Sequence, residues 1–444
     1  MTHLSMRKGW LILGVLSVLL VCAFALLNPR LTIFIESDKF RAEMEKETAK
    51  GLHFPNAHYE PIKRTGTWTA ESAGFRANDG WKALRSIEAH GITARFNPWG
   101  VFLRRWQLDE VRIQSGDVGI QVYEPKPEPS PAKPWYAILL PNRVYLKRVE
   151  SEPVDVTWRF REKRAGFFGT RLLITPHGRD FGYQAREGEL KMSPFPELRL
   201  QHTHLLITKT LLTLYNLDLQ SKTETTGAIH AEGKAGTRDD KSVDFKINFD
   251  RVPVSEWVPK GWRGNVKGAA TGKISWKGQN AKLETSNGEA SLHIADGVIA
   301  KLPFLEKIAV LTGEKELEHL DLDECKLDLE WRYPNADVKN LLIEEKGKIR
   351  ADGEVTIREK ELGGAIELGV ARRLLDWLPK SEEVFPREHD GYMWTTVRLS
   401  GTPEAPEQDL SPRIIEAMKE SPGAALGILF QALGEWLRDT FGGD

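Results

Sequence analysis

Most of the chain alternates apolar and polar residues with a period of two. Three stretches show the pattern without interruption: Val154, Val156, Trp158 and Phe160; Val243, Phe245, Ile247 and Phe249; and Ile366, Leu368 and Val370. Such alternation is typical of strands with one face in water, whereas parallel strands buried on both faces show continuous apolar runs. The phase changes between Leu322 and Cys325, so we expect a bulge or turn at Asp323-Glu324. The pattern predicts a long, mostly antiparallel, one-sided β-sheet.

Helical patterns are few and short. Ser37 is positioned to cap a helix that runs to about Lys50 and ends at Gly51, with Phe40 and Met44 on one side. Residues 303–312 and 372–378 are further short candidates. These helices are too few to cover the sheet, so its apolar face must meet a second sheet, close into a barrel, or line an open groove. We expect the elongated, taco-like groove, a mainly β fold.

The stretch from Trp10 to Leu27 contains 18 residues without a charge. As a helix it is about 27 Å long, enough for the hydrocarbon core of a bilayer. Arg7 and Lys8 favour a cytoplasmic N-terminus. A cleaved signal peptide also fits, because residues 23–25 form an A-x-A site, but the apolar stretch is longer than is usual there. We expect a retained single-pass transmembrane anchor.

Residues 125–134 contain five prolines in ten positions and predict an extended linker. The expected organisation has five parts, which are listed here in chain order: a cytoplasmic tail and anchor (1–36), a helix with a β region (37–124), the linker (125–134), an elongated β domain (135–410) and C-terminal helices (411–444).

The C-terminal residues predict two helices, because Ser411-Pro412 and Ser421-Pro422 each place a capping residue before a proline. The second helix carries an apolar stripe formed by Leu426, Leu429, Phe430, Leu433, Trp436, Leu437 and Phe441. This stripe predicts a contact helix for a membrane, a partner or the groove, or else a helix that plugs the end of the sheet.

One internal repeat is visible, in which Val254–Lys260 resembles Leu374–Lys380 at a spacing of 120 residues. Each copy follows a predicted strand in which apolar and polar residues alternate regularly. Two copies are fewer than a stable solenoid needs, so we interpret the pair as a duplicated edge element.

Charge and cysteine content narrow the function classes. The chain has 62 basic and 63 acidic residues and a net charge of −1, which provides no basic surface for nucleic acid. Cys22 lies in the apolar stretch, so Cys325 has no partner for an intrachain disulfide in the exported part.

Candidate chemistry is weak. His202 and His204 could share one strand face as metal ligands, but no third ligand follows from the spacing. Asp321, Asp323 and Glu324 resemble a calcium cluster only loosely. The motifs of nucleophilic hydrolases, zinc proteases and nucleotide-binding loops are absent. We therefore predict no catalytic, cofactor-binding or metal residues, no cofactor, and a protein that is not an enzyme.

Apolar strand faces remain as the candidate binding surface. The residues expected to line the groove are Val154, Val156, Trp158, Val243, Phe245, Ile247, Phe249, Ile366 and Leu368. The residues expected on the C-terminal contact helix are Leu426, Leu429, Phe430, Leu433, Trp436 and Leu437.

Several motifs of the chain recur together in a known family. They are the expected N-terminal anchor, residues 86–124, GKISWKG (272–278) with GEASLHIADGVIAKLPFLEKIAVLTG (288–313), and VRLSGTPEAPE (397–407). Through them, and most strongly through those after residue 271, the chain resembles the AsmA family of bacterial envelope proteins. The resemblance implies an inner-membrane anchor with a periplasmic body, and a β groove that carries phospholipid or assists outer-membrane assembly.

The sequence thus yields two hypotheses. The first is a single-pass inner-membrane protein whose periplasmic β groove binds or transports phospholipid acyl chains, with no nucleic-acid partner. The second is a structural or assembly factor that contacts other envelope proteins and holds no lipid.

Overall fold

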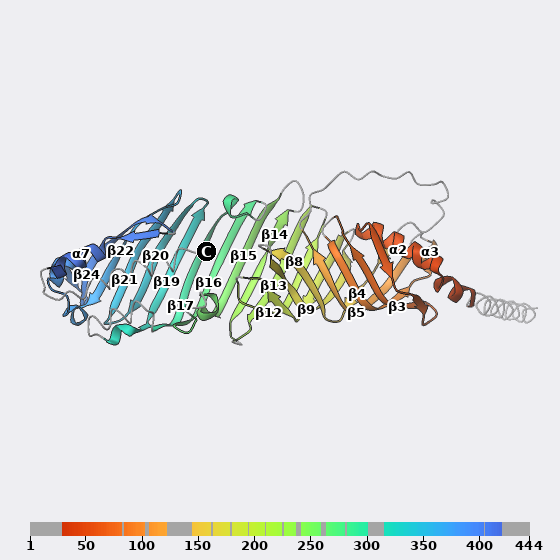
Figure 1. Cartoon of the computed structure of the whole chain (residues 1–444), viewed down its shortest axis with the longest axis horizontal. Helices are drawn as coiled ribbons and strands as arrows, with labels where there is room; N and C mark the ends of the chain where they lie inside the picture. Colours follow the sequence, from red (N-terminus) through yellow and green to blue (C-terminus); the bar gives the residue numbers. More distant parts are fainter. Residues whose placement is uncertain are drawn as a thin grey trace, which may run out of the picture. The chain divides into compact units, whose positions relative to one another are not determined.

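The computed structural model is mainly β, with few helices (Figure 1). It describes residues 29–81, 84–102, 106–121, 144–160, 163–177, 180–193, 195–208, 210–223, 226–236, 241–258, 263–279, 282–300, 315–403 and 405–419. The mainly β fold predicted from the alternation of apolar and polar residues is confirmed. Within the described residues no helix is long and apolar enough to cross a membrane. The predicted anchor, residues 10–27, lies outside them.

The chain divides into two compact units, residues 1–194 and 195–444. The division does not coincide with the proline-rich segment 125–134, which lies outside the described residues. Strands before and after that segment pair directly, because β5 (Trp106–Ile120) is parallel to β6 (Val144–Leu146). The segment therefore connects two strands of one sheet, and the boundary between compact units comes some 60 residues later than the predicted linker.

Unit 1 is a sheet built around three long strands. β5 also pairs in parallel with β7 and β8, and the other described pairings within this unit are antiparallel. Parallel neighbours need a long connection instead of a tight turn, and the separation of β5 from β6 in sequence provides it. The remaining elements are β1 (Asn56–Tyr59), β2 (Ile62–Arg64), β3 (Thr69–Asn78), β4 (Leu84–Phe96), α3 (Trp99–Phe102), β7 (Val149–Ser151), β8 (Val154–Phe160), β9 (Lys163–His177), β10 (Asp180–Arg186) and β11 (Glu189–Lys191).

Helix α2 (Asp38–Leu52) packs on the apolar face of unit 1. The Ser37 side chain accepts a hydrogen bond from the Phe40 amide, as expected for its cap. Phe40 and Met44 are buried, which confirms the predicted apolar side of the helix. The end of the helix differs from the prediction: Gly51 lies within α2, and His53 takes the left-handed conformation that closes it.

Carboxylates also cover the outer edge of this sheet. Among the described residues, β1 and β2 each pair with β3 and with no other strand. The Tyr59 amide donates to Glu45 Oε1 at 2.9 Å, and the Arg64 amide donates to Glu36 Oε1 at 3.0 Å. Unpaired edge amides would otherwise be open to another strand, so these side chains reduce the risk of edge-to-edge association.

Unit 2 is an antiparallel meander in which nearly every strand pairs with the next one along the chain (Figure 1). Its strands are β12 (Leu198–Ile207), β13 (Leu211–Ser221), β14 (Ala228–Gly236), β15 (Ser242–Pro253), β16 (Val266–Gln279), β17 (Asn287–Ala300), β18 (His319–Leu322), β19 (Glu324–Arg332), β20 (Asn335–Glu345), β21 (Ile349–Arg358), β22 (Glu361–Ala371), β23 (Arg387–His389), β24 (Tyr392–Thr402) and β25 (Ala405–Gln408). Its helices are α4 (Val254–Trp257), η3 (Leu283–Thr285), η4 (Lys315–Glu318), η5 (Arg372–Leu375), α6 (Ser381–Val384) and α7 (Leu410–Lys419).

Several local predictions can be compared with unit 2. The expected break lies at Asp323, because β18 ends at Leu322, β19 begins at Glu324, and both strands pair with β17. The helix expected at 372–378 is only the 3₁₀ turn η5. Ser411 does not cap α7, because Gln408 Oε1 accepts from the amides of Leu410 and Ser411 at 2.7 and 2.9 Å. The candidate helix 303–312 lies outside the described residues.

The last strands of unit 2 end in a buried cluster, here called the terminal cluster. Its members are Leu375, Leu378, Val384, Phe385, Met393 and Ala417, and Leu368, Val370, Leu410 and Ile414 pack against it. α7 is held there by Arg413, whose guanidinium donates to Thr395 Oγ1 and to the Thr396 carbonyl, each at 2.8 Å. β23 and β25 pair with the two ends of β24, and Arg413 occupies the gap between them.

Removal of the Arg413 side chain should open this edge. For Arg413→Ala we expect amide hydrogen exchange in residues 395–398 to become about 10-fold faster or more, since a charged donor of this kind contributes about 1.5–3 kcal/mol. Exchange followed by mass spectrometry measures it. Arg398→Ala removes an exposed guanidinium from the same strand and serves as the control. Equal exchange in the two variants would show that Arg413 does not hold the edge.

Candidate functional site

The strand register of unit 2 collects apolar residues on one side of the sheet. Directly paired positions form what we call the central row, which crosses nine adjacent strands from β14 to β24. Its members are Ala231, Ile247, Ile274, Ala290, Leu329, Val338, Val355, Gly364 and Leu399. Each member is apolar, and a slip of one residue in any strand would replace its member with a residue of the other face.

A second row runs parallel to the first and contains the cysteine. This Cys325 row consists of Val252, Ala270, Ile294, Cys325, Ile343, Ala351 and Leu368. We call the side of the sheet that carries both rows the apolar face. The larger side chains of the central row, such as Ile274 and Leu329, are half-buried. They therefore remain partly accessible from outside the sheet.

Glycines on this face let aromatic rings lie flat. A Cβ at Gly272 would lie 2.6 Å from Cζ of Phe249, and one at Gly288 would lie 2.5 Å from Cζ2 of Trp331. The rings therefore occupy the space above the glycines of the neighbouring strands.

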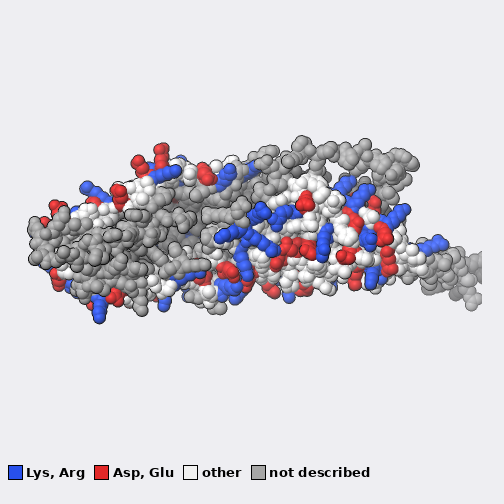
Figure 2. All heavy atoms as spheres, in the orientation of Figure 1, with Lys and Arg blue, Asp and Glu red and all other residues white. Residues whose placement is uncertain are grey.

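The opposite side of the sheet is polar. The row that lies one residue away from the central row contains Lys246, Ser275, Glu289, Glu330, Asp337 and Thr356. Ion pairs join neighbouring strands there, such as Lys339–Glu330 at 2.8 Å. Where Figure 2 shows described residues, acidic and basic side chains lie next to one another. The prediction of one dry and one wet face fits the register of unit 2.

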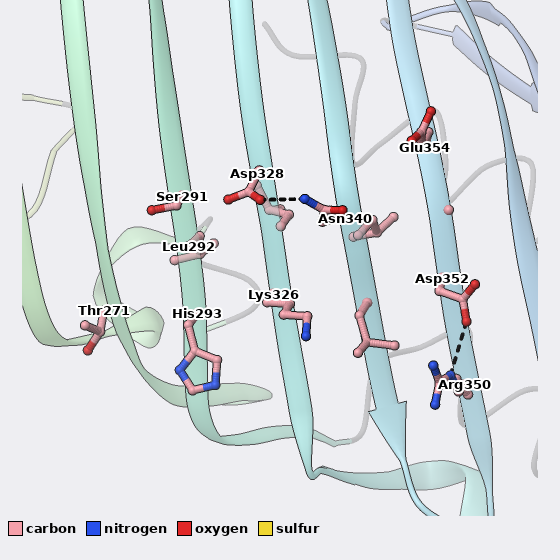
Figure 3. Close-up of a pocket in the computed structure, with 14 residues that line it drawn as sticks. Thr271, Ser291, Leu292, His293, Lys326, Asp328, Asn340, Arg350, Asp352 and Glu354 are labelled. Atoms are coloured by element: carbon pink, nitrogen blue, oxygen red, sulfur yellow. Dashed lines mark hydrogen bonds and ion pairs between the residues drawn. The ribbon is translucent and has the colours of Figure 1, made fainter.

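A depression of about 720 Å³ lies on the polar side, across β17, β19, β20 and β21 (Figure 3). Several of its polar side chains are hydrogen-bonded to one another: Asn340 donates to Asp328 at 2.8 Å, and Arg350 donates to Asp352 at 3.1 Å. The hydrogen bond that Arg350 donates to Asp352 raises the pKa of Arg350, so this guanidinium stays charged. These hydrogen bonds engage Asp328, Arg350 and Asp352, and we assign no chemistry to the depression.

The histidines singled out in the sequence make local contacts. His202 Nδ1 lies 3.0 Å from Asn216 Nδ2, and the ring of His204 packs on Tyr215 at 4.8 Å. Asp321 is hydrogen-bonded to His319 at 2.8 Å, and Asp323 accepts from the Lys346 amide. In the described part of the chain, no group of three or more His, Cys, Asp or Glu side chains is arranged to hold a metal ion.

The predicted groove residues fall into two sets. Val154, Val156 and Trp158 lie on β8 in unit 1, where Val154 is buried and the Trp158 ring packs edge-on against Phe167 at 5.6 Å. The remaining six lie on β15 and β22 of unit 2, at the apolar face: Val243, Phe245, Ile247, Phe249, Ile366 and Leu368. Leu368 also packs against the terminal cluster.

Sequence reasoning missed the part of the face contributed by β20. The alternation there changes phase between Val338 and Leu341, because Asn340 takes a positive φ of 50° in a bulge. Both halves of the strand therefore place apolar residues on the same face, although their spacing is odd. An asparagine between two out-of-phase apolar runs was the available signal. The predicted contact-helix residues 426–437 lie outside the described residues.

No protein-family model, curated protein or solved structure matches the chain.

The reactivity of the Cys325 thiol measures how far the apolar face is shielded from water at this position. Burial raises the pKa of its thiol above the usual value of about 8.5. In a Cys22→Ser variant we expect alkylation of Cys325 by iodoacetamide at pH 8 to be slower than that of a free thiol, and to go on rising with pH where the rate of a free thiol has levelled off. Intact-mass spectrometry follows the reaction.

The raised pKa of Cys325 also predicts how the stability of the fold changes with pH. The thiol of Cys325 loses its proton at a lower pH in the unfolded chain than in the folded chain. The folded state is therefore destabilised as the pH rises above the pKa that the thiol has in the unfolded chain. Unfolding in urea should restore ordinary reactivity. A native rate equal to that of the unfolded chain would contradict the burial of Cys325.

Proposed function

We propose that this chain is a membrane-anchored, non-enzymatic protein of the bacterial envelope that binds lipid acyl chains on the apolar face of unit 2. The observation that carries the proposal is the central row, an uninterrupted apolar path whose larger side chains remain partly accessible. Water contact with such a surface is unfavourable, so it calls for an apolar occupant.

The size of the row fits an acyl chain. With strands about 4.8 Å apart, eight intervals span about 38 Å. One acyl chain occupies about half of a hydrocarbon core that is about 30 Å thick. The row therefore accommodates about two chain lengths end to end. Each methylene removed from water contributes about 0.8 kcal/mol, so ten methylenes contribute about 8 kcal/mol, the scale of micromolar binding.

The remaining parts of the proposal come from the sequence. The apolar stretch 10–27 would hold the chain in the inner membrane as a single span with the N-terminus in the cytoplasm. The resemblance to the AsmA family supports a periplasmic body, and the open apolar face supports a groove. Phospholipid transport or a part in outer-membrane biogenesis follows as the role of such a body.

A matched pair of substitutions on β15 tests lipid binding. Ile247→Asp places a carboxylate in the central row, whereas Asn248→Asp places one on the polar face opposite Lys273. We expect wild type and Asn248→Asp to carry phospholipid after purification from membranes in mild detergent. Ile247→Asp should carry about tenfold less, because an unpaired charge on this surface is costly to desolvate.

Lipid extraction and mass spectrometry give the ratio of lipid to protein, and circular dichroism checks that each variant is folded. A wild-type protein without lipid would overturn the proposal. Equal lipid content in the two variants would place the lipid elsewhere than on this face.

One observation favours the second hypothesis, a factor that contacts other envelope proteins. Phe195 and Trp257 are each 44% exposed, and their rings lie 6.1 Å apart. Trp257 belongs to the first copy of the internal repeat. Its counterpart Trp377 is half-buried beside the terminal cluster, where its indole donates to the Leu374 carbonyl at 2.8 Å. Exposed aromatic pairs of this kind are common at protein contacts.

Photo-cross-linking at Trp257 tests this second role. A photoreactive phenylalanine analogue at Trp257 should trap a discrete envelope protein in cells. The same analogue at Tyr333, which is also 44% exposed, should not. Mass spectrometry identifies the product. Identical patterns from both positions, or capture of lipid alone, would count against a specific protein partner.

A further inference from the structure

The apolar face of unit 2 ends at the point where the described chain leaves the fold. α7 packs on the terminal cluster through Leu410, Ile414 and the buried Ala417. Leu368 and Val370 of β22 contact the same cluster from the sheet. Ala417, two residues before the end of the described chain, thus belongs to the cluster against which Leu368 packs, and Leu368 is the first member of the Cys325 row on this side.

The length of the segment after Lys419 matches the length of the Cys325 row. Residues 423–441 would be about 28 Å long as a helix at 1.5 Å per residue. The Cys325 row from β22 to β16 contains five strand intervals of about 4.8 Å, or about 24 Å. A helix laid across the strands would therefore cover most of this row.

The chemistry of the segment also matches. The residues of 423–441 that share one helical side are mainly leucines and aromatics, and Gln431, Glu435 and Arg438 lie opposite. The stripe provides the apolar partner that the half-buried side chains of the Cys325 row need. Few basic residues occur in the segment, so its polar side has little attraction for anionic lipid.

We propose that residues 423–441 form a helix that lies across the apolar face from β22 toward β17, with the stripe that contains Leu429, Leu433 and Trp436 against the sheet. We call this position of the helix on the apolar face the cover. The cover itself does not require lipid. That the helix competes with acyl chains for the face rests on the proposed function.

The position of Cys325 makes the geometry measurable. β19 lies three strand intervals from β22, about 14 Å, which corresponds to about ten residues of helix. Counted from residue 423, this distance places Leu433 above Cys325. Single cysteines are introduced at positions 429, 431, 433, 435, 436 and 438 in the full chain carrying Cys22→Ser, so that Cys325 is the only other thiol.

A short bismaleimide then joins the two thiols, and intact mass reports the intramolecular product. We expect the rate to follow the helical period, with Leu433→Cys at least tenfold faster than Glu435→Cys. Urea should abolish the difference. Rates without helical period, or a covalent dimer as the main product, would overturn the cover, and the dimer would assign the face to a second copy of the chain.

Deletion of residues 421–444 separates this inference from the proposed function. If the helix competes with lipid, the truncated protein should carry more phospholipid per chain than the full chain does. Unchanged lipid content would overturn the competition. Periodic cross-linking in a protein that never binds lipid would support the cover and overturn the proposed function.

Discussion

Register in the antiparallel ladder is the constraint on which unit 2 depends. The side-chain period of a strand is two, so a slip of one residue would turn a whole strand's apolar set to the wet side. The central row remains apolar from Ala231 to Leu399 because each strand keeps its register with the next. Bulges at Arg251 and Asn340, both with positive φ, adjust strands whose apolar runs are out of phase.

A ladder of this kind creates edges that must be covered. In unit 1 the outermost amides of β1 and β2 donate to Glu45 and Glu36. In unit 2 the last long strand, β24, is paired at both ends by short strands, and Arg413 bonds to its middle. The two units use different residues for the same purpose: a charged side chain satisfies backbone groups that a further strand would otherwise bind.

The apolar face, unlike the edges, is not fully covered by the described residues. Its aromatic rings lie over glycines, and its leucines and isoleucines stay half-buried. A fold whose only purpose was stability would bury these side chains, since each contributes about 1.5–3 kcal/mol when fully removed from water. We therefore interpret the face as a binding surface, for which an acyl chain and the amphipathic C-terminal segment are the two proposed occupants.

The sequence was enough to predict the mainly β fold, the antiparallel pairing of unit 2, the cap at Ser37 and the break at Asp323, because alternation, capping and breaks in phase are local. It also identified Ile247, Phe249 and Ile366 as residues of an apolar strand face. The folded structure was needed to show that Val154 and Val156 belong to a different unit and that β5 has parallel neighbours across the proline-rich segment. It also decided that β20 joins the face through the bulge at Asn340. These outcomes depend on which strands pair, which is a long-range choice that the hydrophobic pattern within a single strand does not encode.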